Sequence, residues 1–268
     1  MDAIDLMLSH IFSNDISVFL IVGPLMLVAA ELGHRFGLSL HRSQDEPRSK
    51  QAETVQAAAL ALMGLLLAFT FSAAIQRYDQ RNRLVVEEAN AIGTAYLRVA
   101  FLPETMQGDT KNLFRHYVAV RLQRQQATDF PEKLAAHEAQ LAKIQQQLWD
   151  AGAAVERSSP NSMTTSYTTA LNAMFDSDSF RLKATRDHVP GAVWLLLLIM
   201  TATGCGFTGY RAGTLGRRSK LPLIILPLLV TVVIVLVSDL DRPAHGLVRL
   251  NESSLYDLQH SFGPISDK

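Results

Sequence analysis

The stretch from Val55 to Leu102 constrains the fold of this chain more than any other. It begins with an uncharged apolar run, Ala58 to Ile75, and about 20 such residues are enough to cross the hydrocarbon core of a bilayer as a helix. The stretch then continues through charged sequence with Gly93 as its one interruption. We therefore expect a single long helix that spans the membrane and projects several turns into water.

Three further apolar blocks have similar lengths: Ile16 to Leu32, Val189 to Phe207 and Leu221 to Val237. Their concentration in blocks predicts four transmembrane crossings. The segment 104–187 shows helical periodicity and no strand pattern. The predicted fold class is all-α, an integral membrane helical bundle with four transmembrane helices. Its helical extramembrane domain is formed by the long second helix and the 104–187 segment.

Domain boundaries follow from the same blocks. We predict a first transmembrane helix pair (1–76), an extramembrane helical domain (77–188), a second transmembrane pair (189–240) and an extramembrane C-terminal tail (241–268). The polar linker Arg35 to Glu53 is interpreted as an exposed loop. The N-terminal segment before the first block holds acids but no Lys or Arg, so it lacks the positive region of a cleaved signal peptide, and we expect the first crossing to be retained.

Two faces of the second helix suggest close packing and a pore. Small residues recur at spacings of three and four and form a small-residue face: Ala57, Ala61, Gly64, Ala68 and Ser72. A bulky stripe lies about a third of a turn away and consists of Leu62, Leu66, Phe69, Ala73 and Gln76. Around the axis of an oligomer this stripe would line a pore with a hydrophobic constriction that gates by dewetting. Otherwise it faces lipid or the other helices.

Glu88 falls on the apolar face of the same helix beyond the membrane, whereas Glu87 and Arg98 lie on another face. A buried carboxylate needs a cation or several hydrogen-bond donors. We therefore predict a pair with an Arg of a neighbouring helix, for which Arg115 and Arg181 are candidates. The alternative is that Glu88 senses an ion or a ligand.

Other charged residues lie near the ends of crossings. Glu31 either faces a partner or a cavity, as carboxylates within a span do, or sits at the interface beside Arg35. Asp239, Asp241 and Arg242 cluster where the fourth crossing ends. The segment supplies too few oxygen ligands for a hard cation, so we expect a water-facing helix end with an internal Asp–Arg pair.

A heptad-like pattern from Leu134 to Val155 resembles a coiled-coil seam that could bind a partner helix. In the tail, Leu255 and Leu258 are placed to dock on the helical domain. The single cysteine, Cys205, lies in the third apolar block and is expected to pack as a small apolar residue.

The sequence carries no motif of an enzyme. The eight histidines show no HExxH spacing, and there is no Gly-rich phosphate loop, no GxSxG and no acid–base dyad on one helix face. We therefore expect no catalytic residues, no metal and no cofactor. The 25 basic and 25 acidic side chains give zero formal net charge, which argues against nucleic acid as a partner.

Three segments together resemble the bacterial bestrophin-like membrane proteins of unknown function: Gly64 to Arg98, Ala170 to Leu198 and Asp239 to Gly246. The resemblance implies a homo-oligomeric ion channel, anion-selective as bestrophins are, with a phenylalanine neck on the second helix, where Phe69 and Phe71 lie. It also implies a multi-pass protein of the bacterial inner membrane whose partners are the lipid bilayer, its own copies and the permeant inorganic ion.

Two features depart from the bestrophin pattern. There is no dense acidic run like the bestrophin calcium clasp. The two short loops between crossings hold four Lys or Arg each, so the positive-inside rule places both termini outside, whereas bestrophin termini are cytosolic. Two other functions stay open: a non-conducting scaffold or sensor that recruits a partner through its helical domain, and a transporter in which Glu31 couples protons.

Overall fold

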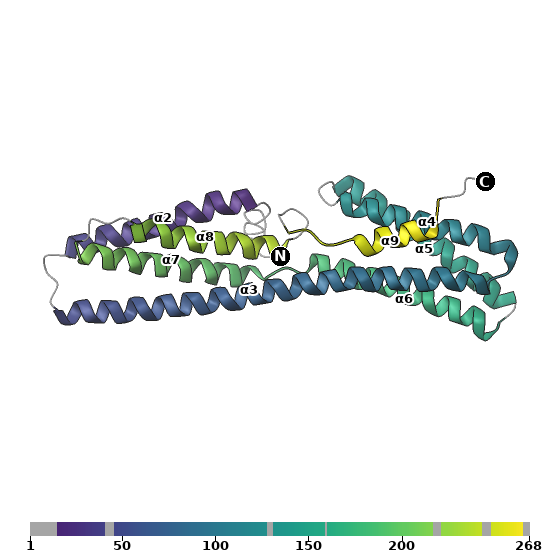
Figure 1. Ribbon diagram of the computed structural model, residues 1–268, viewed down its shortest axis with the longest axis horizontal. Coiled ribbons are helices and arrows are strands. Elements are labelled where there is room, and N and C mark those ends of the chain that lie inside the picture. The colour runs from purple at the N-terminus through teal and green to yellow at the C-terminus, as the bar shows by residue number, and fades with distance from the viewer. Residues whose placement is uncertain are drawn as a thin grey trace. The chain divides into compact units, whose positions relative to one another are not determined.

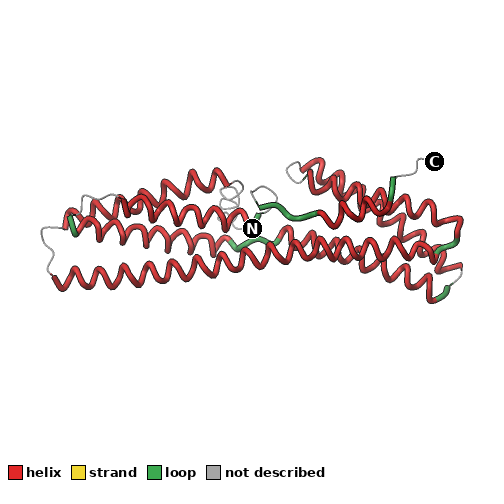
Figure 2. Tube along the Cα trace, in the orientation of Figure 1, coloured by secondary structure: helices red, strands yellow, loops and turns green. Residues whose placement is uncertain are grey.

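The computed structural model describes residues 15–40, 46–127, 131–158, 160–216, 221–242 and 248–264. Within those ranges every regular element is a helix and none is a strand (Figure 2). The predicted all-α fold is therefore confirmed. The chain divides into two compact units, here named the membrane unit (1–78 and 188–249) and the extramembrane unit (79–187 and 250–268).

The membrane unit is built from α2 (Asp15–Leu40), the first part of α3 (Glu46–Leu97), α7 (Gly191–Thr214) and α8 (Leu221–Asp241). The described residues include four helices long and apolar enough to cross a membrane, as the four apolar blocks predict. Helices α2, α7 and α8 pack side by side (Figure 1). Every fourth residue of α2 is buried in their shared core, namely Val18, Val22, Met26 and Ala30.

Glycines bring α2 and α7 into backbone contact. A Cβ atom built on Gly33 would lie 2.0 Å from the carbonyl oxygen of Gly206, and one on Gly209 would lie 1.9 Å from that of Ala30. Gly37 and Gly213 repeat this arrangement one turn later. Each helix thus presents a small-xxx-small pair to the other, which permits the close approach on which membrane helix packing depends.

Both helices that flank the first loop are longer than predicted. α2 continues to Leu40 and α3 begins at Glu46, so most of the linker predicted as an exposed loop is helical. The apolar end of α2 stays helical because Gly37 packs on α7. At the start of α3, Pro47 is in the first turn, where proline is tolerated, and the Lys, Gln, Ala and Glu that follow favour helix.

The extramembrane unit holds the rest of α3, the short 3-10 helix η2 (Arg98–Phe101), and four α-helices: α4 (Glu104–Gln126), α5 (Pro131–Ser158), α6 (Ser162–Arg186) and α9 (Ser253–Phe262). Pro103 separates η2 from α4. Asn161 begins α6 with a capping box: its side chain accepts from the backbone N–H groups of Met163 (2.9 Å) and Thr164 (3.0 Å), and its own backbone N–H donates to Thr164 Oγ1 at 3.2 Å.

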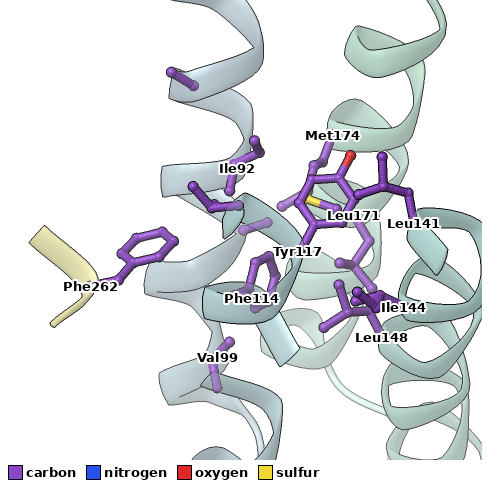
Figure 3. Packing of buried hydrophobic residues seen from close by; sticks show 14 of the residues in the cluster. Ile92, Val99, Phe114, Tyr117, Leu141, Ile144, Leu148, Leu171, Met174 and Phe262 are labelled. Carbon is purple, nitrogen blue, oxygen red and sulfur yellow. The ribbon is translucent and has the colours of Figure 1, made fainter. Parts of the chain in front are cut away.

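The core of this unit gathers around two aromatic residues of α4, Phe114 and Tyr117 (Figure 3). The heptad-like seam of α5 contributes Leu141, Ile144, Leu148 and Val155, all of them buried in that core. From α9, Leu255 is fully buried and Leu258 packs against the same cluster, as expected for the tail. The seam is therefore occupied by the helices of its own unit.

The limits of the two units fall at 78/79, 187/188 and 249/250, so α9 belongs to the extramembrane unit. The domain boundaries at 76/77, 188/189 and 240/241 stay predictions.

Candidate pore face and buried charge clusters

Within the membrane unit, α3 leaves about half of its circumference uncovered. The five residues of the small-residue face are all exposed, and nothing lies within 4 Å of a Cβ built on Gly64. In the bulky stripe Phe69 is 65% exposed and Leu62 54% exposed, and Ala73 and Gln76 are exposed as well. We call this half the uncovered face of α3.

Leu66 is placed differently from the other residues of the stripe. It is half-buried and packs against the core of the membrane unit, whose nearby α3 members Met63 and Ala74 are fully enclosed. Leu65, which the sequence analysis did not select, is exposed on the uncovered face. The stripe therefore keeps Leu62 and Phe69 as its large uncovered side chains, with Leu65 beside them.

The exposed sides of α2 and α8 have a different composition from that of α3. They carry large aliphatic residues, such as Leu20 (63% exposed) and Leu229 (58% exposed), which suit contact with lipid. The uncovered face of α3 is mostly Ala and Gly, and towards its C-terminal end it carries Ser72 and Gln76. Its chemistry suits contact with protein or water.

In the extramembrane unit, Glu88 is fully buried and forms ion pairs with two arginines. Arg121 donates from Nε and Nη2 to the two carboxylate oxygens of Glu88, at 2.7 and 2.9 Å. The Nε of Arg181 lies 2.9 Å from Glu88 Oε2. The pairing with Arg181 is as predicted, whereas Arg115 donates instead to the carbonyl oxygen of Phe262.

A second ion pair adjoins the first. Arg124 donates to Asp178, and Gln145 lies within hydrogen-bond reach of the same carboxylate at 3.4 Å. On the α9 side, Glu252 Oε1 lies 3.5 Å from Arg121 Nη2. The buried cluster thus contains three arginines (Arg121, Arg124, Arg181) and three acids (Glu88, Asp178, Glu252), so its formal charges cancel.

The environment shifts the pKa values of this cluster in opposite directions. Burial works against the charge of Arg121, but Glu88 outweighs it and the pKa of Arg121 is raised. Burial lowers the pKa of Arg181 to about 10, so that it stays charged at neutral pH. Burial also disfavours ionisation of Asp178, yet the hydrogen bond and charge of Arg124 prevail and lower its pKa. For Glu252 burial prevails and the pKa is raised.

The remaining charged candidates have separate settings. Glu87 is exposed, and Arg98 donates from Nη1 to the carbonyl oxygen of Ser166 at 2.7 Å. Glu31 accepts a hydrogen bond from Arg35 Nε at 2.8 Å, and both side chains are exposed. These residues are not brought together with the Glu88 cluster.

The end of α8 differs from the predicted water-facing helix end, because Asp239 and Asp241 are both buried. Asp241 accepts from the backbone N–H of Val189, at 3.1 Å to each carboxylate oxygen, just before α7 begins. Asp239 accepts from the backbone N–H of Val248 at 3.1 Å. Arg77 Nη1 lies 3.7 Å from Asp241 Oδ1. A carboxylate near a helix N-terminus is stabilising, which applies to Asp241 beside the start of α7. Through these hydrogen bonds Asp241 holds the segment before α7, and Asp239 holds the chain at Val248.

Sequence reasoning missed Arg121 and Arg124. Both lie on the face of α4 that also carries Phe114, Tyr117 and Val118, and arginine on an apolar face was the signal available. In the described part of the chain, no group of three or more His, Cys, Asp or Glu is arranged to hold a metal ion.

A scan of family models decides the affiliation, since the model of the Bestrophin-like domain matches residues 24–255. The chain belongs to the Bestrophin-like family. No curated protein matches it in sequence. Its fold resembles a crystallised membrane protein variant at TM-score 0.66 and 12% identity, covering 88% of this chain and 96% of the other. A bacterial bestrophin homologue from Klebsiella pneumoniae, also a point variant, gives TM-score 0.62 and 13% identity over 92% and 97% of the two chains.

Proposed function

We propose that this member of the Bestrophin-like family is a homo-oligomeric membrane channel whose pore is lined by the uncovered face of α3. One observation carries the proposal: in the membrane unit α3 exposes about half of its circumference, where a face of Ala, Gly and Ser lies beside a stripe with Leu62 and Phe69, whereas α2 and α8 expose large aliphatic side chains. Contact of a single chain with lipid does not account for the small and polar residues on this face. Copies arranged around an axis would cover its small residues and leave the bulky stripe towards the centre.

Phe69 and Leu62 would form the narrowest part of the path. They lie seven positions apart, or about two helical turns, and both are well exposed. A ring of such side chains repels water and closes a pore without filling it, so that modest widening permits conduction. Leu65 adds to this constriction. Leu66 is half-buried and packs between the constriction and the core of the membrane unit.

We propose that the permeant species are anions and that the protein lies in a bacterial inner membrane. The resemblance to bestrophins supports both proposals. No charged side chain lies on α3 between Ala57 and Gln76 to oppose anions there. The placement of both termini outside stays a prediction of the charge count.

Flux measurements test the channel directly. Purified protein in liposomes should carry anions, and its mass in detergent should be a multiple of the 29.6 kDa chain. Phe69→Ala should raise the flux because it widens the constriction, whereas Leu20→Ala, on the exposed side of α2, should leave it unchanged. An intact oligomer that is silent in both the parent and the Phe69→Ala form would contradict the proposal.

The scaffold alternative rested on the seam Leu134 to Val155. Because the seam residues Leu141, Ile144, Leu148 and Val155 are buried in the core of their own unit, that surface does not offer itself to a partner helix. The transporter alternative rested on proton coupling by Glu31. Because Glu31 forms an ion pair with Arg35, the structure gives this alternative no added support.

A further inference from the structure

A pocket of about 650 Å³ opens on the membrane unit where α2, α3 and α7 meet. This size lies within the usual range of small-molecule sites, roughly 300–1,000 Å³. Its apolar lining includes Phe36 and Leu40 of α2, Ala52 and Val55 of α3, and Gly206 and Phe207 of α7. Polar groups are few, and they come from Gln51, Thr203 and Tyr210.

The pocket lies at the edge of the hydrocarbon region. Its lining residues follow the apolar block of α2, precede that of α3 and come from the second half of α7. Tyr210 packs against Phe36, with ring centroids 5.9 Å apart, and aromatic residues with a polar tip are typical of this depth in a membrane. Phe36, which lines the pocket, and Leu32, four positions before it on α2, are both exposed. Lipid chains are the medium that such a surface meets.

The three helices that line the pocket also carry basic residues close to it in sequence. Each of the three helices carries one directly next to a lining residue in sequence: Arg35 before Phe36, Lys50 before Gln51, and Arg211 after Tyr210. Glu31 and Glu53 pair with the two arginines, at 2.8 and 2.6 Å. Lys50 remains beside these two ion pairs, so the five described charges next to the pocket lining sum to one positive charge.

We propose that the pocket binds one acyl chain of an anionic phospholipid, whose phosphate lies beside Arg35, Lys50 and Arg211. The apolar lining suits the acyl chain, and the three basic residues suit the headgroup. Basic pockets between transmembrane helices are known to hold anionic headgroups. This site does not depend on ion conduction, so it stands or falls separately from the channel.

Lipid retention tests the site. The full-length protein is incorporated into nanodiscs with equal amounts of phosphatidylglycerol and phosphatidylcholine of identical chains, released into detergent, and examined by native mass spectrometry. We expect phosphatidylglycerol to be retained about fivefold or more over phosphatidylcholine, the preference that about one favourable basic contact produces. Thr203→Phe, which fills the pocket, should reduce retention about tenfold, and Ala192→Phe, exposed on the same helix, should not.

A second variant covers the case in which Thr203→Phe does not fold. Lys50→Gln should lower the preference for phosphatidylglycerol, while Lys143→Gln, exposed in the extramembrane unit, should leave it unchanged. Equal retention of the two lipids would overturn the proposal, as would unchanged retention in Thr203→Phe. A smaller oligomer mass in Thr203→Phe with unchanged lipid would mean that a second copy fills the pocket, which also overturns it.

Discussion

At the scale of single residues, Glu88 is the anion that two buried guanidinium groups share. Removing one partner of a buried ion pair leaves the others without compensation, which costs about 3–5 kcal/mol. We predict that Glu88→Ala destabilises the extramembrane unit by about this amount. The exposed neighbour provides a matched control, since Glu87→Ala should change stability by less than about 0.5 kcal/mol. Urea unfolding followed by Trp149 fluorescence, in a Trp194→Phe background, measures both.

The two acids at the edge of the cluster should respond to pH in opposite ways. The pKa of Asp178 is lowered in the folded state, so its stabilisation is complete above its ordinary pKa and is lost as pH falls below that value. The pKa of Glu252 is raised, so its contribution weakens as pH rises above its ordinary pKa. At pH 7, Asp178→Asn should therefore destabilise the unit and Glu252→Gln should stabilise it. The same urea titration at pH 7 checks this, and a loss of stability in Glu252→Gln would contradict it.

A buried charged residue could be predicted from the sequence only where it interrupted the pattern of its own helix face. Glu88 was recognisable because a carboxylate interrupts an apolar stripe, and Arg181 followed as a partner. Arg121 was not, because arginines are usually exposed and two of them on one face of α4 can be mistaken for its solvent side. The burial of Asp241 depends on the backbone N–H of Val189, 52 positions earlier in the chain, which no local pattern reveals.

At the scale of elements, the contact between α2 and α7 depends on glycine. Gly209→Ala would place a methyl group against the backbone of Ala30, and forcing the helices apart should cost about 1–3 kcal/mol or more. Gly108→Ala is a matched control on α4, where nothing lies within 4 Å of the new methyl group and better helix propensity should add about 0.5–1 kcal/mol. Thermal stability in detergent, followed by size-exclusion chromatography after heating, should fall in the first variant and not in the second.

The helices themselves were largely predictable, but the ends of α2 and α3 at the first loop were not. The starts of α4 and α6 at Glu104 and Ser162 agree with the sequence because Pro103 and Asn161 mark them. The extension of α2 to Leu40 depends on its tertiary contact with α7 through Gly37, and tertiary contacts override local polarity. The glycine pairs of α2 and α7 were visible in sequence, but which helix each would meet was not.

At the scale of the whole molecule, a pore lined by α3 requires that copies of the chain assemble through the small-residue face. Ala61→Phe should therefore weaken assembly, because a bulky ring prevents the close approach that small residues allow. Leu20→Phe, on the exposed side of α2, should leave assembly intact. Mass measurement in detergent distinguishes them, and an unchanged mass in Ala61→Phe would mean that copies meet elsewhere.

Thiol modification during flux measurements tests the claim that water and ions pass along the uncovered face of α3. The native chain has one cysteine, the buried Cys205, and serves as the unreactive background. Phe69→Cys, Gln76→Cys and, as a control, Leu20→Cys are treated with a charged methanethiosulfonate reagent while anion flux from liposomes is recorded. We predict that the reagent changes flux in the two α3 variants and not in the control. Flux that persists unaltered in modified Phe69→Cys and Gln76→Cys protein would contradict the claim.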